Sequence, residues 1–186
     1  MFFARRGYDV VGVDISADIV EAASALRDQA GLENLTFLEN DYESLEFEDE
    51  FDIVVFFDSL HHAVAENLAM RRACAALRAG GVCVTHEPGE GHAHSAEAIE
   101  AVQNYQVTEK DMPPKKIVSL AREAGFREFS LFAFPCENRM VAYRLTPTQS
   151  VTDQKQMRMI SPLAGASPMK RLFHRSVRWR CNFSQA

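Results

Sequence analysis

The chain has 186 residues, of which 47% are hydrophobic, and a formal net charge of −6. This length suffices for one α/β domain with a substantial core, and the acidic balance argues against nucleic acid as the main partner. No apolar run approaches the roughly 20 residues of a membrane span, and the start "MFFARRGY" lacks the apolar core and cleavage site of a signal peptide.

Strand-like and helix-like segments alternate from the N-terminus. The β-branched run at 10–14 predicts a short strand, and apolar spacing over 16–30 predicts a helix that ends before Gly31. Residues 35–40 predict a second strand. The continuous apolar run at 51–58 is typical of a strand that is buried on both faces of a parallel sheet.

The alternation continues through the second half of the chain. Further elements are expected as a helix at 63–79, a strand at 82–87, a helix at 95–105, a helix opened by Pro113-Pro114 and stopped by Gly125, and a later antiparallel strand at 126–134. This order predicts an α/β fold with a mostly parallel sheet and helices on both of its faces.

The composition changes near residue 147. We expect the α/β domain over 1–147 and a polar linker with a basic tail over 148–186, because no acidic residue follows Asp153. Within the tail, one helical face would carry Met169, Leu172, Phe173 and Val177. The tail is either a peripheral helix or frayed end, or a basic amphipathic helix that meets a membrane surface or an acidic partner. No convincing final strand is apparent after residue 140.

Four successive predicted strands end in polar side chains. These are Asp14, then Asp41-Tyr42, then Asp58-Ser59 with His61-His62 just beyond, and finally His86-Glu87. Ligands bind outside the carboxyl ends of the strands in an open parallel sheet, so we expect all four groups along one edge.

The first two strand ends suit a nucleoside. The Asp14 carboxylate can accept hydrogen bonds from two vicinal ribose hydroxyls, whereas its alternative role, capping the next helix, is already open to Ser16. Asp41 can accept a hydrogen bond from an adenine amino group, and Tyr42 offers a flat face to the ring. The alternative for this pair is a loop acid beside a surface tyrosine.

Three stretches carry a family resemblance: "DVVGVDIS", "LENDYESLEFEDEFDIVVFFDSLHH" and "LRAGGVCVTHEP". In this order they resemble motifs II to V of the class I S-adenosylmethionine-dependent methyltransferases, over roughly residues 1–135. The loop "PGEGHAHS" and the later "YQVTEKDMPP", followed by "LAREAGF", resemble bacterial methyltransferases associated with sugar or polysaccharide modification. The resemblance implies a Rossmann-like fold with a reversed final strand, and S-adenosyl-L-methionine as cofactor.

The resemblance also implies roles for individual residues on the cofactor side. By the family pattern, Asp14 binds the ribose hydroxyls, Ile15 packs beside the adenine, Asp41 and Tyr42 frame its amino group and ring, and Phe57 and Asp58 line the methionine side.

One part of the family pattern is missing. The family's first strand and its glycine-rich turn have no counterpart in the thirteen residues before Asp14, and "FFARRGY" resembles the end of the helix that follows that turn. We therefore expect a fragment or a gene model that begins at an internal methionine, rather than a degenerate binding protein. Whether such a fragment binds its cofactor is not determined by the sequence pattern.

Catalysis needs an oriented acceptor and, for a hydroxyl, a base near the transferred methyl group. His62 is the first candidate for this base and His61 the second, since both follow the strand at 51–58 and imidazole has a suitable pKa. Glu87, at the next strand end, could bind or deprotonate the acceptor. The alternative is that both histidines only cap or pack on the next helix.

A metal site is not expected. His86, Glu87, His92 and His94 are residue types that bind zinc or iron, and Glu90 lies in the same loop. Their spacing is irregular, however, so we predict no metal ligands. The glycines at 89 and 91 favour a mobile acceptor lid instead.

These observations predict S-adenosylmethionine-dependent methyl transfer to a small-molecule or sugar acceptor, with oxygen as the favoured atom. A non-catalytic module that binds a partner through the basic tail is the main alternative, and an NAD-dependent oxidoreductase is a third. Four cysteines without a CxxC pair favour reduced thiols in a cytoplasmic protein. The acceptor, the atom methylated and the oligomeric state are not determined by these patterns.

Overall fold

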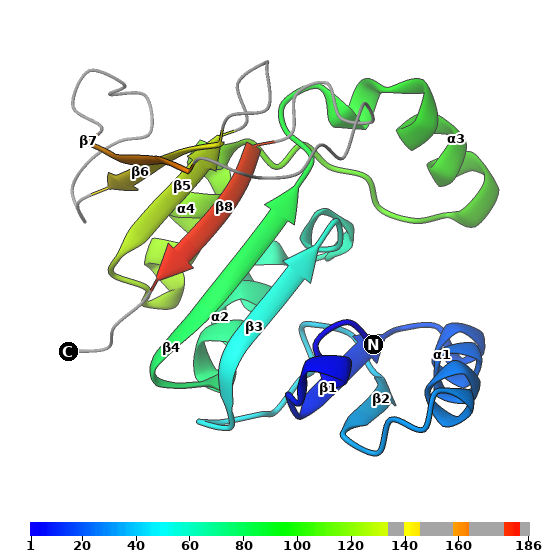
Figure 1. Cartoon of the computed structure of the whole chain (residues 1–186). Coiled ribbons are helices and arrows are strands. Elements are labelled where there is room, and N and C mark those ends of the chain that lie inside the picture. The colour runs from blue at the N-terminus through cyan, green and yellow to red at the C-terminus, as the bar shows by residue number, and fades with distance from the viewer. Residues whose placement is uncertain (134–139, 146–157, 164–176, 183–186) are drawn as a thin grey trace. The chain divides into compact units, whose positions relative to one another are not determined.

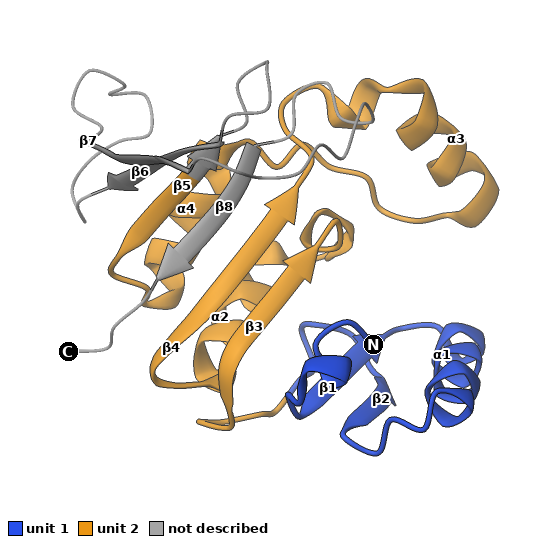
Figure 2. Ribbon diagram, viewed as in Figure 1, with its two compact units in different colours: residues 1–45 blue, residues 46–186 orange. Residues whose placement is uncertain are grey.

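The computed structural model describes residues 1–133, 140–145, 158–163 and 177–182. The chain divides into two compact units, Met1–Leu45 and Glu46–Ala186 (Figure 2). A two-stranded sheet belongs to the first unit and a six-stranded sheet to the second. Within the described part of the chain, every helix is too short or too polar to cross a lipid bilayer.

The first unit is built around a parallel pair of strands. Strand β1 (Val10–Asp14) pairs with β2 (Leu35–Glu39), and helix α1 (Ala17–Gln29) is the connection between them. The helix begins at Ser16, whose hydroxyl accepts a backbone N–H of the first turn. The sequence predicted the bounds of all three elements to within one residue.

Two sets of contacts hold this strand pair in register. Gly12 lies opposite Phe37, and a Cβ added at Gly12 would come within 2.6 Å of the phenylalanine ring. The Asn34 side chain donates to the carbonyl oxygens of Ala4 (2.9 Å) and Tyr8 (2.7 Å). It thereby ties the N-terminal 3-10 turn η1 (Ala4–Arg6) to the start of β2.

Helix α1 buries none of its residues. Ile19 and Leu26, on the apolar face that predicted this helix, are 54% and 53% exposed. Apolar periodicity therefore located the helix correctly without a corresponding buried surface beneath it.

The second unit contains a mixed sheet in the order β3-β4-β8-β5-β6-β7 (Figure 1). Its strands are β3 (Phe51–Phe57), β4 (Leu77–Glu87), β5 (Phe129–Ala133), β6 (Met140–Leu145), β7 (Arg158–Leu163) and β8 (Val177–Asn182). Strands β3 and β4 are parallel, and the other neighbouring pairs are antiparallel. The α/β class is confirmed, and so is the antiparallel strand expected near 126–134.

Strands β6, β7 and β8 correct the expectation that no convincing strand follows residue 140. Strand β8 lies between β4 and β5 and is antiparallel to both. Strand propensity depends on cross-strand partners, and these segments of six residues find them only in the folded sheet. The helical face expected at Met169, Leu172 and Phe173 lies outside the described residues, whereas Val177 opens β8.

Two helices form the main core of the second unit. Helix α2 (Glu66–Ala76) packs on β3 and β4, and helix α4 (Pro114–Ala124) packs on α2 (Figure 1). Helix α4 ends, as predicted, at Gly125, whose φ of 113° suits glycine. Helix α3 (Ala96–Tyr105) follows the loop after β4. The side chains that α2 and α4 bury are Ala69, Met70, Ala73, Ala76, Ile117, Val118 and Ala121.

Strand β3 is covered on one face. Phe56 is 5% exposed, whereas Ile53, Val55 and Phe57 on the opposite face are between 42% and 63% exposed. The apolar run of β3 predicted burial on both faces, and the structure shows it on the face toward α2.

The helix expected at 63–79 is shorter at both ends. Before it, the chain forms a 3-10 turn, η2 (Leu60–His62), because the Glu87 carboxylate accepts the N–H groups of Ser59, Leu60 and His61. After it, the chain enters β4 at Leu77. A carboxylate distant in sequence therefore decides where α2 can start.

Candidate functional site

Asp14 ends β1 with one carboxylate oxygen already engaged. Its Oδ1 accepts the backbone N–H of Ser16 (2.9 Å), and its main-chain carbonyl accepts that of Asn40 (3.0 Å). The Ser16 hydroxyl makes the helix cap itself, with Ile19 as donor at 3.4 Å. Asp14 thus shapes the turn with Oδ1, and no described contact uses Oδ2.

Asp41 lies at the same edge of the first sheet as Asp14, since β1 and β2 are parallel and in register. Its carboxylate accepts the backbone N–H of Ser44 (2.6 Å) and the Ser44 hydroxyl (2.9 Å). Tyr42 is half-buried, and Ile15 is 74% exposed. Asp14 and Asp41, each with its chain neighbour Ile15 or Tyr42, thus follow two paired strands at one edge of the first sheet.

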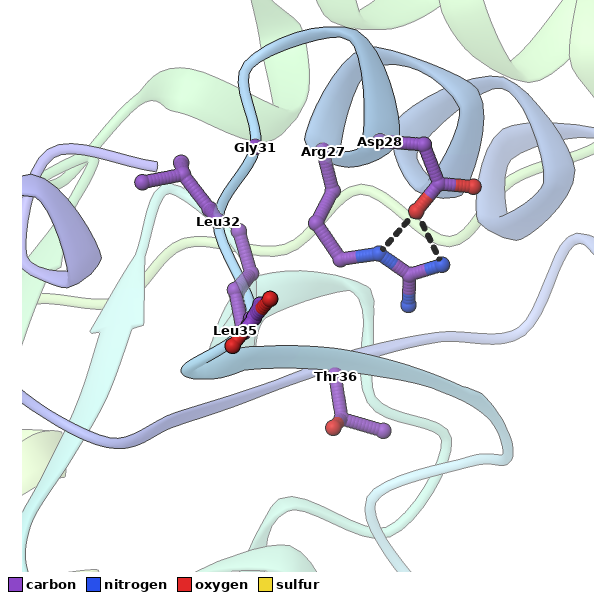
Figure 3. A pocket seen from close by; sticks show the side chains of 7 residues that line it. Arg27, Asp28, Gly31, Leu32, Leu35 and Thr36 are labelled. Atoms are coloured by element: carbon purple, nitrogen blue, oxygen red, sulfur yellow. Dashed lines mark hydrogen bonds and ion pairs between the residues drawn. The ribbon is translucent and has the colours of Figure 1, made fainter.

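The first unit also has a pocket, which lies away from Asp14 and Asp41 (Figure 3). Its walls are Arg27, Asp28, Gly31, Leu32, Glu33, Leu35 and Thr36. The Arg27 guanidinium pairs with the Asp28 carboxylate at 2.7 Å. Because the pocket is at the start of β2, the opposite end from Asp41, it does not coincide with the expected cofactor residues.

In the second unit, Asp58 follows β3 in a left-handed conformation, with φ of 47°. Aspartate tolerates this region better than most residues, and such outliers cluster at functional sites. The Asp58 N–H donates to the carbonyl of His86 (2.7 Å), and the Asp58 Oδ1 lies 3.2 Å from His86 Nδ1. Phe57 stacks on the His86 ring, with centroids 4.7 Å apart. The two expected methionine-side residues therefore frame His86.

Glu87 is fully buried, and both of its carboxylate oxygens accept hydrogen bonds. Its Oε1 accepts the N–H groups of Ser59 (3.2 Å) and Leu60 (2.9 Å), and its Oε2 accepts that of His61 (3.2 Å). The His61 Nδ1 lies 2.7 Å from the same Oε2. Glu87 therefore positions η2 and His61, and its carboxylate does not face an open site.

Three histidines surround a second carboxylate, Glu109. Glu109 oxygens lie 3.3 Å from His61 Nε2, 3.7 Å from His62 Nδ1 and 2.8 Å from His92 Nε2. The Glu109 side chain is 7% exposed. We call these four residues, together with Glu87, the histidine cluster.

His62 is the most exposed histidine of this cluster, because its side chain is 37% exposed against 26% for His92 and 5% for His61. Its Nδ1 lies 2.7 Å from the Thr108 carbonyl oxygen. A carbonyl only accepts, so Nδ1 carries the proton and Nε2 keeps its lone pair. The neutral tautomer fixed in this way is the one that a general base requires.

Sequence reasoning missed Glu109 and Thr108 as site residues. Both lie in the stretch "YQVTEKDMPP", which was noted for its resemblance, and its concentration of acids was the available signal. Of the four residues considered as metal ligands, Glu87 and His92 both belong to the histidine cluster, through His61 and Glu109. His86 contacts Asp58 instead, and His94 is exposed.

Charged contacts hold the loop with Glu109 in place. Asp111 accepts the N–H groups of Gly91 (2.9 Å) and Ala93 (2.8 Å), and these bonds hold the pKa of Asp111 below its usual range. The Lys110 ammonium donates to the carbonyls of Ala63 (2.7 Å) and Val64 (3.0 Å). The loop is therefore fastened both to the segment after η2 and to the loop after β4.

Comparison with known proteins decides the family. A family model described as a methyltransferase domain matches residues 3–141, which is most of the chain. The chain belongs to the methyltransferase-domain family. The resemblance to class I S-adenosylmethionine-dependent methyltransferases, drawn from three motifs, is thereby confirmed.

Individual relatives of this methyltransferase domain are more distant. The uncharacterised methyltransferase YcgJ of Bacillus subtilis (strain 168) is 34% identical over 80 residues, which are 42% of this chain and 32% of YcgJ. The crystal structure of YcgJ superposes with a TM-score of 0.55 at 20% identity, over 66% of this chain and 53% of that one. This methyltransferase domain therefore spans about a third of YcgJ in the sequence match and about half in the structural one.

Two further structures share the fold. Phosphoethanolamine N-methyltransferase 2 of Haemonchus contortus, in complex with S-adenosyl-L-methionine, has a TM-score of 0.56 at 26% identity, covering 66% of this chain and 29% of its own. The cyclase SpnF has a TM-score of 0.57 at 21% identity, covering 68% of this chain and 46% of its own. The fold thus occurs with different reactions, so the reaction must be argued from the site.

Proposed function

We propose that this methyltransferase domain transfers a methyl group from S-adenosyl-L-methionine to a hydroxyl of a small molecule or saccharide. The observation that carries the proposal is the family match over residues 3–141. The Haemonchus contortus relative, which holds S-adenosyl-L-methionine, supports the choice of cofactor. The charge of −6 offers no footprint for nucleic acid as acceptor.

On the cofactor side, Asp14 binds the ribose hydroxyls. The turn uses its Oδ1, and a carboxylate oxygen has two lone pairs, so the group can shape the turn and accept ligand hydrogen bonds together. Asp41 and Tyr42 receive the adenine from the same sheet edge, and the exposed Ile15 packs beside it. Phe57 and Asp58 contact the methionine part.

On the acceptor side, His62 is the base. Methyl transfer from a sulfonium is an in-line displacement, in which the acceptor oxygen forms its bond to carbon as the carbon–sulfur bond breaks and the hydroxyl proton leaves to a base. The Thr108 carbonyl holds His62 in the tautomer with a free Nε2, and the ring reaches solvent. Glu87 and His61 act as positioning residues behind it.

Calorimetric titration of the chain with S-adenosylhomocysteine, beside NADH, tests the cofactor. Binding of S-adenosylhomocysteine alone is the expected result. Binding of NADH alone would instead indicate an oxidoreductase. Binding of neither would contradict catalysis by this chain and favour a partner-binding module, with the basic C-terminal segment as its contact with an acidic partner or membrane surface.

The cytoplasmic location expected from the cysteines stays a prediction, tested by fractionation of cells that express the chain.

A further inference from the structure

The histidine cluster contains more ligand groups than a single general base requires. One ring nitrogen each from His61 and His62 and one carboxylate oxygen of Glu109 all lie within 4.8 Å of one another. Two imidazoles and one carboxylate form a common ligand set for divalent transition metals. We propose that this chain binds a zinc-class divalent metal ion through His61, His62 and Glu109.

The position of His61 between two carboxylates is the first argument. Glu87 accepts three backbone N–H groups, so its oxygens act as acceptors and His61 Nδ1 must be the donor across their 2.7 Å contact. The other ring nitrogen, Nε2, lies 3.3 Å from an oxygen of Glu109. His61 is therefore fixed between two carboxylates, with one nitrogen bonded to Glu87 and the other directed at Glu109.

The length of that contact is the second argument. Hydrogen bonds between a charged N–H and a carboxylate are typically about 2.7–2.9 Å, shorter than the 3.3 Å between His61 and Glu109. When a nitrogen and an oxygen both bind zinc tetrahedrally at about 2.0–2.1 Å, they lie about 3.3 Å from each other. The pair is therefore spaced as two ligands of one ion.

The partners behind the histidines are the third argument. Metal-bound histidines almost always donate the other ring N–H to a carboxylate or a backbone carbonyl, which fixes the tautomer and the ring orientation. His61 has the buried Glu87 carboxylate in this role, and His62 has the Thr108 carbonyl. Both rings are thus fixed in orientation beside Glu109, with His61 Nε2 at 3.3 Å and His62 Nδ1 at 3.7 Å from its oxygens.

His92 contacts the same Glu109 oxygen as His61. Its Nε2 lies 2.8 Å from Glu109 Oε2, and its ring centroid lies 5.2 Å from that of His61. His92 therefore orients the carboxylate and lies outside the set of three ligands. Imidazole nitrogens favour zinc, iron or cobalt over magnesium, so the ligand set also predicts which ions bind.

The use of the ion rests on the proposed function, whereas its binding does not. With the ion present, His62 binds the metal and no longer serves as the general base. An acceptor hydroxyl bound to the metal instead loses its proton more readily, as metal-bound water does. The proton leaves to solvent and the acceptor oxygen attacks the methyl carbon, so the methyl transfer itself is unchanged.

Titration of the chelator-treated chain with zinc chloride near neutral pH tests the site. We expect one zinc ion per chain and no measurable binding of magnesium. Glu109→Gln keeps the shape and removes the charge, and we expect it to weaken zinc binding at least tenfold, as should His62→Ala. His94→Ala is the matched control, because His94 is an exposed histidine of the neighbouring loop, outside the cluster. The zinc affinity of the His94→Ala variant should equal that of the unsubstituted chain.

Cobalt substitution separates this site from the cysteines. Nitrogen and oxygen ligands give visible ligand-field bands without a thiolate charge-transfer band, and Glu109→Gln should remove those bands. Absence of zinc binding, equal affinity in Glu109→Gln, or a thiolate band would each overturn the proposal. Circular dichroism checks that each variant is folded. If His62→Ala does not fold, the isosteric Glu109→Gln variant decides the test. Titration with S-adenosylhomocysteine is independent, so the metal site and the proposed function can fail separately.

Discussion

Glu87 illustrates how a single buried carboxylate organises its surroundings. Burying a charge is costly unless hydrogen bonds replace the lost water, and three backbone N–H groups together with His61 supply them. The same bonds shape η2 and fix the tautomer of His61. One residue thus links the end of β4 to the orientation of the candidate site.

Replacing Asp14 with alanine should weaken S-adenosylhomocysteine binding by about 1.5–3 kcal/mol, the size of a hydrogen bond to a charged group. Isothermal titration calorimetry measures the change. Asp14→Asn separates the two roles, since it retains an acceptor for the Ser16 N–H. Asp9→Ala, an exposed aspartate just before β1, should leave the affinity unchanged. An unchanged affinity in Asp14→Ala would refute the ribose role.

Replacing His62 with alanine should lower methyl transfer about 10²–10⁴-fold and spare cofactor affinity, because a positioned base contributes on that scale. The assay follows labelled methyl groups from S-adenosyl-L-methionine into a panel of saccharide acceptors. His94→Ala should retain turnover. Loss of S-adenosylhomocysteine binding in His62→Ala would make this residue structural instead.

At the scale of elements, glycine and side-chain contacts decide how neighbouring segments meet. Gly12 allows β1 to approach the Phe37 ring of β2, and Asp111 fastens the loop before α4 to the loop after β4. Neither contact changes the type of an element, but each fixes a position on which the candidate site depends.

Gly12→Ala should destabilise the first unit by about 1–3 kcal/mol, the usual cost of overpacking. Its Cβ would meet the Phe37 ring at 2.6 Å, and the strand pairing leaves little room for adjustment. Combining it with Phe37→Leu should cost less than the sum of the single changes. Amide hydrogen exchange of β1 and β2 measures the effect. Additive effects would show that the ring and the new methyl group do not meet.

Acidification should loosen the loop that carries Glu109. Backbone hydrogen bonds from Ala93 and Gly91 lower the pKa of Asp111, so its stabilising effect is complete above its unfolded-state pKa of about 4 and is lost as the pH falls through the lower folded value. Exchange protection of the Gly91 and Ala93 amides should fall below about pH 4. Asp111→Asn should show less of this pH dependence, whereas Glu100→Gln on α3 should retain it. Protection unaffected by pH would contradict the role of Asp111.

On the scale of the whole molecule, both units expose large apolar side chains to solvent. In the second unit, Phe56 faces the core while Ile53, Val55 and Phe57 are exposed. In the first unit, α1 exposes Ile19 and Leu26. Exposed apolar surface of this kind is typical of a contact region.

The two faces of β3 should respond differently to truncation. Phe56→Ala should destabilise the second unit by about 3–5 kcal/mol, because it leaves a cavity in the core. Val55→Ala, its neighbour on the exposed face, should cost less than about 1 kcal/mol. Urea unfolding monitored by circular dichroism measures both. Equal effects would mean that the Val55 face is covered in solution.

The sequence by itself determined the family, the order of the elements through β5 and the acids at the strand ends. These features depend on local periodicity and on motifs that are continuous in the chain. Asp14 and Asp41 could be placed at one edge because parallel strands bring their carboxyl ends together.

Only the tertiary structure decided the composition of the histidine cluster and the place of β8. Glu109 is distant in sequence from His61, and no spacing rule relates a loop before α4 to a turn after β3. Strand β8 is only six residues long, and its pairing with β4 and β5 depends on partners that a local pattern does not contain. Such contacts between residues far apart in the sequence form only when the chain folds. The position of the Glu109 carboxylate beside His61 could therefore be found only in the tertiary structure.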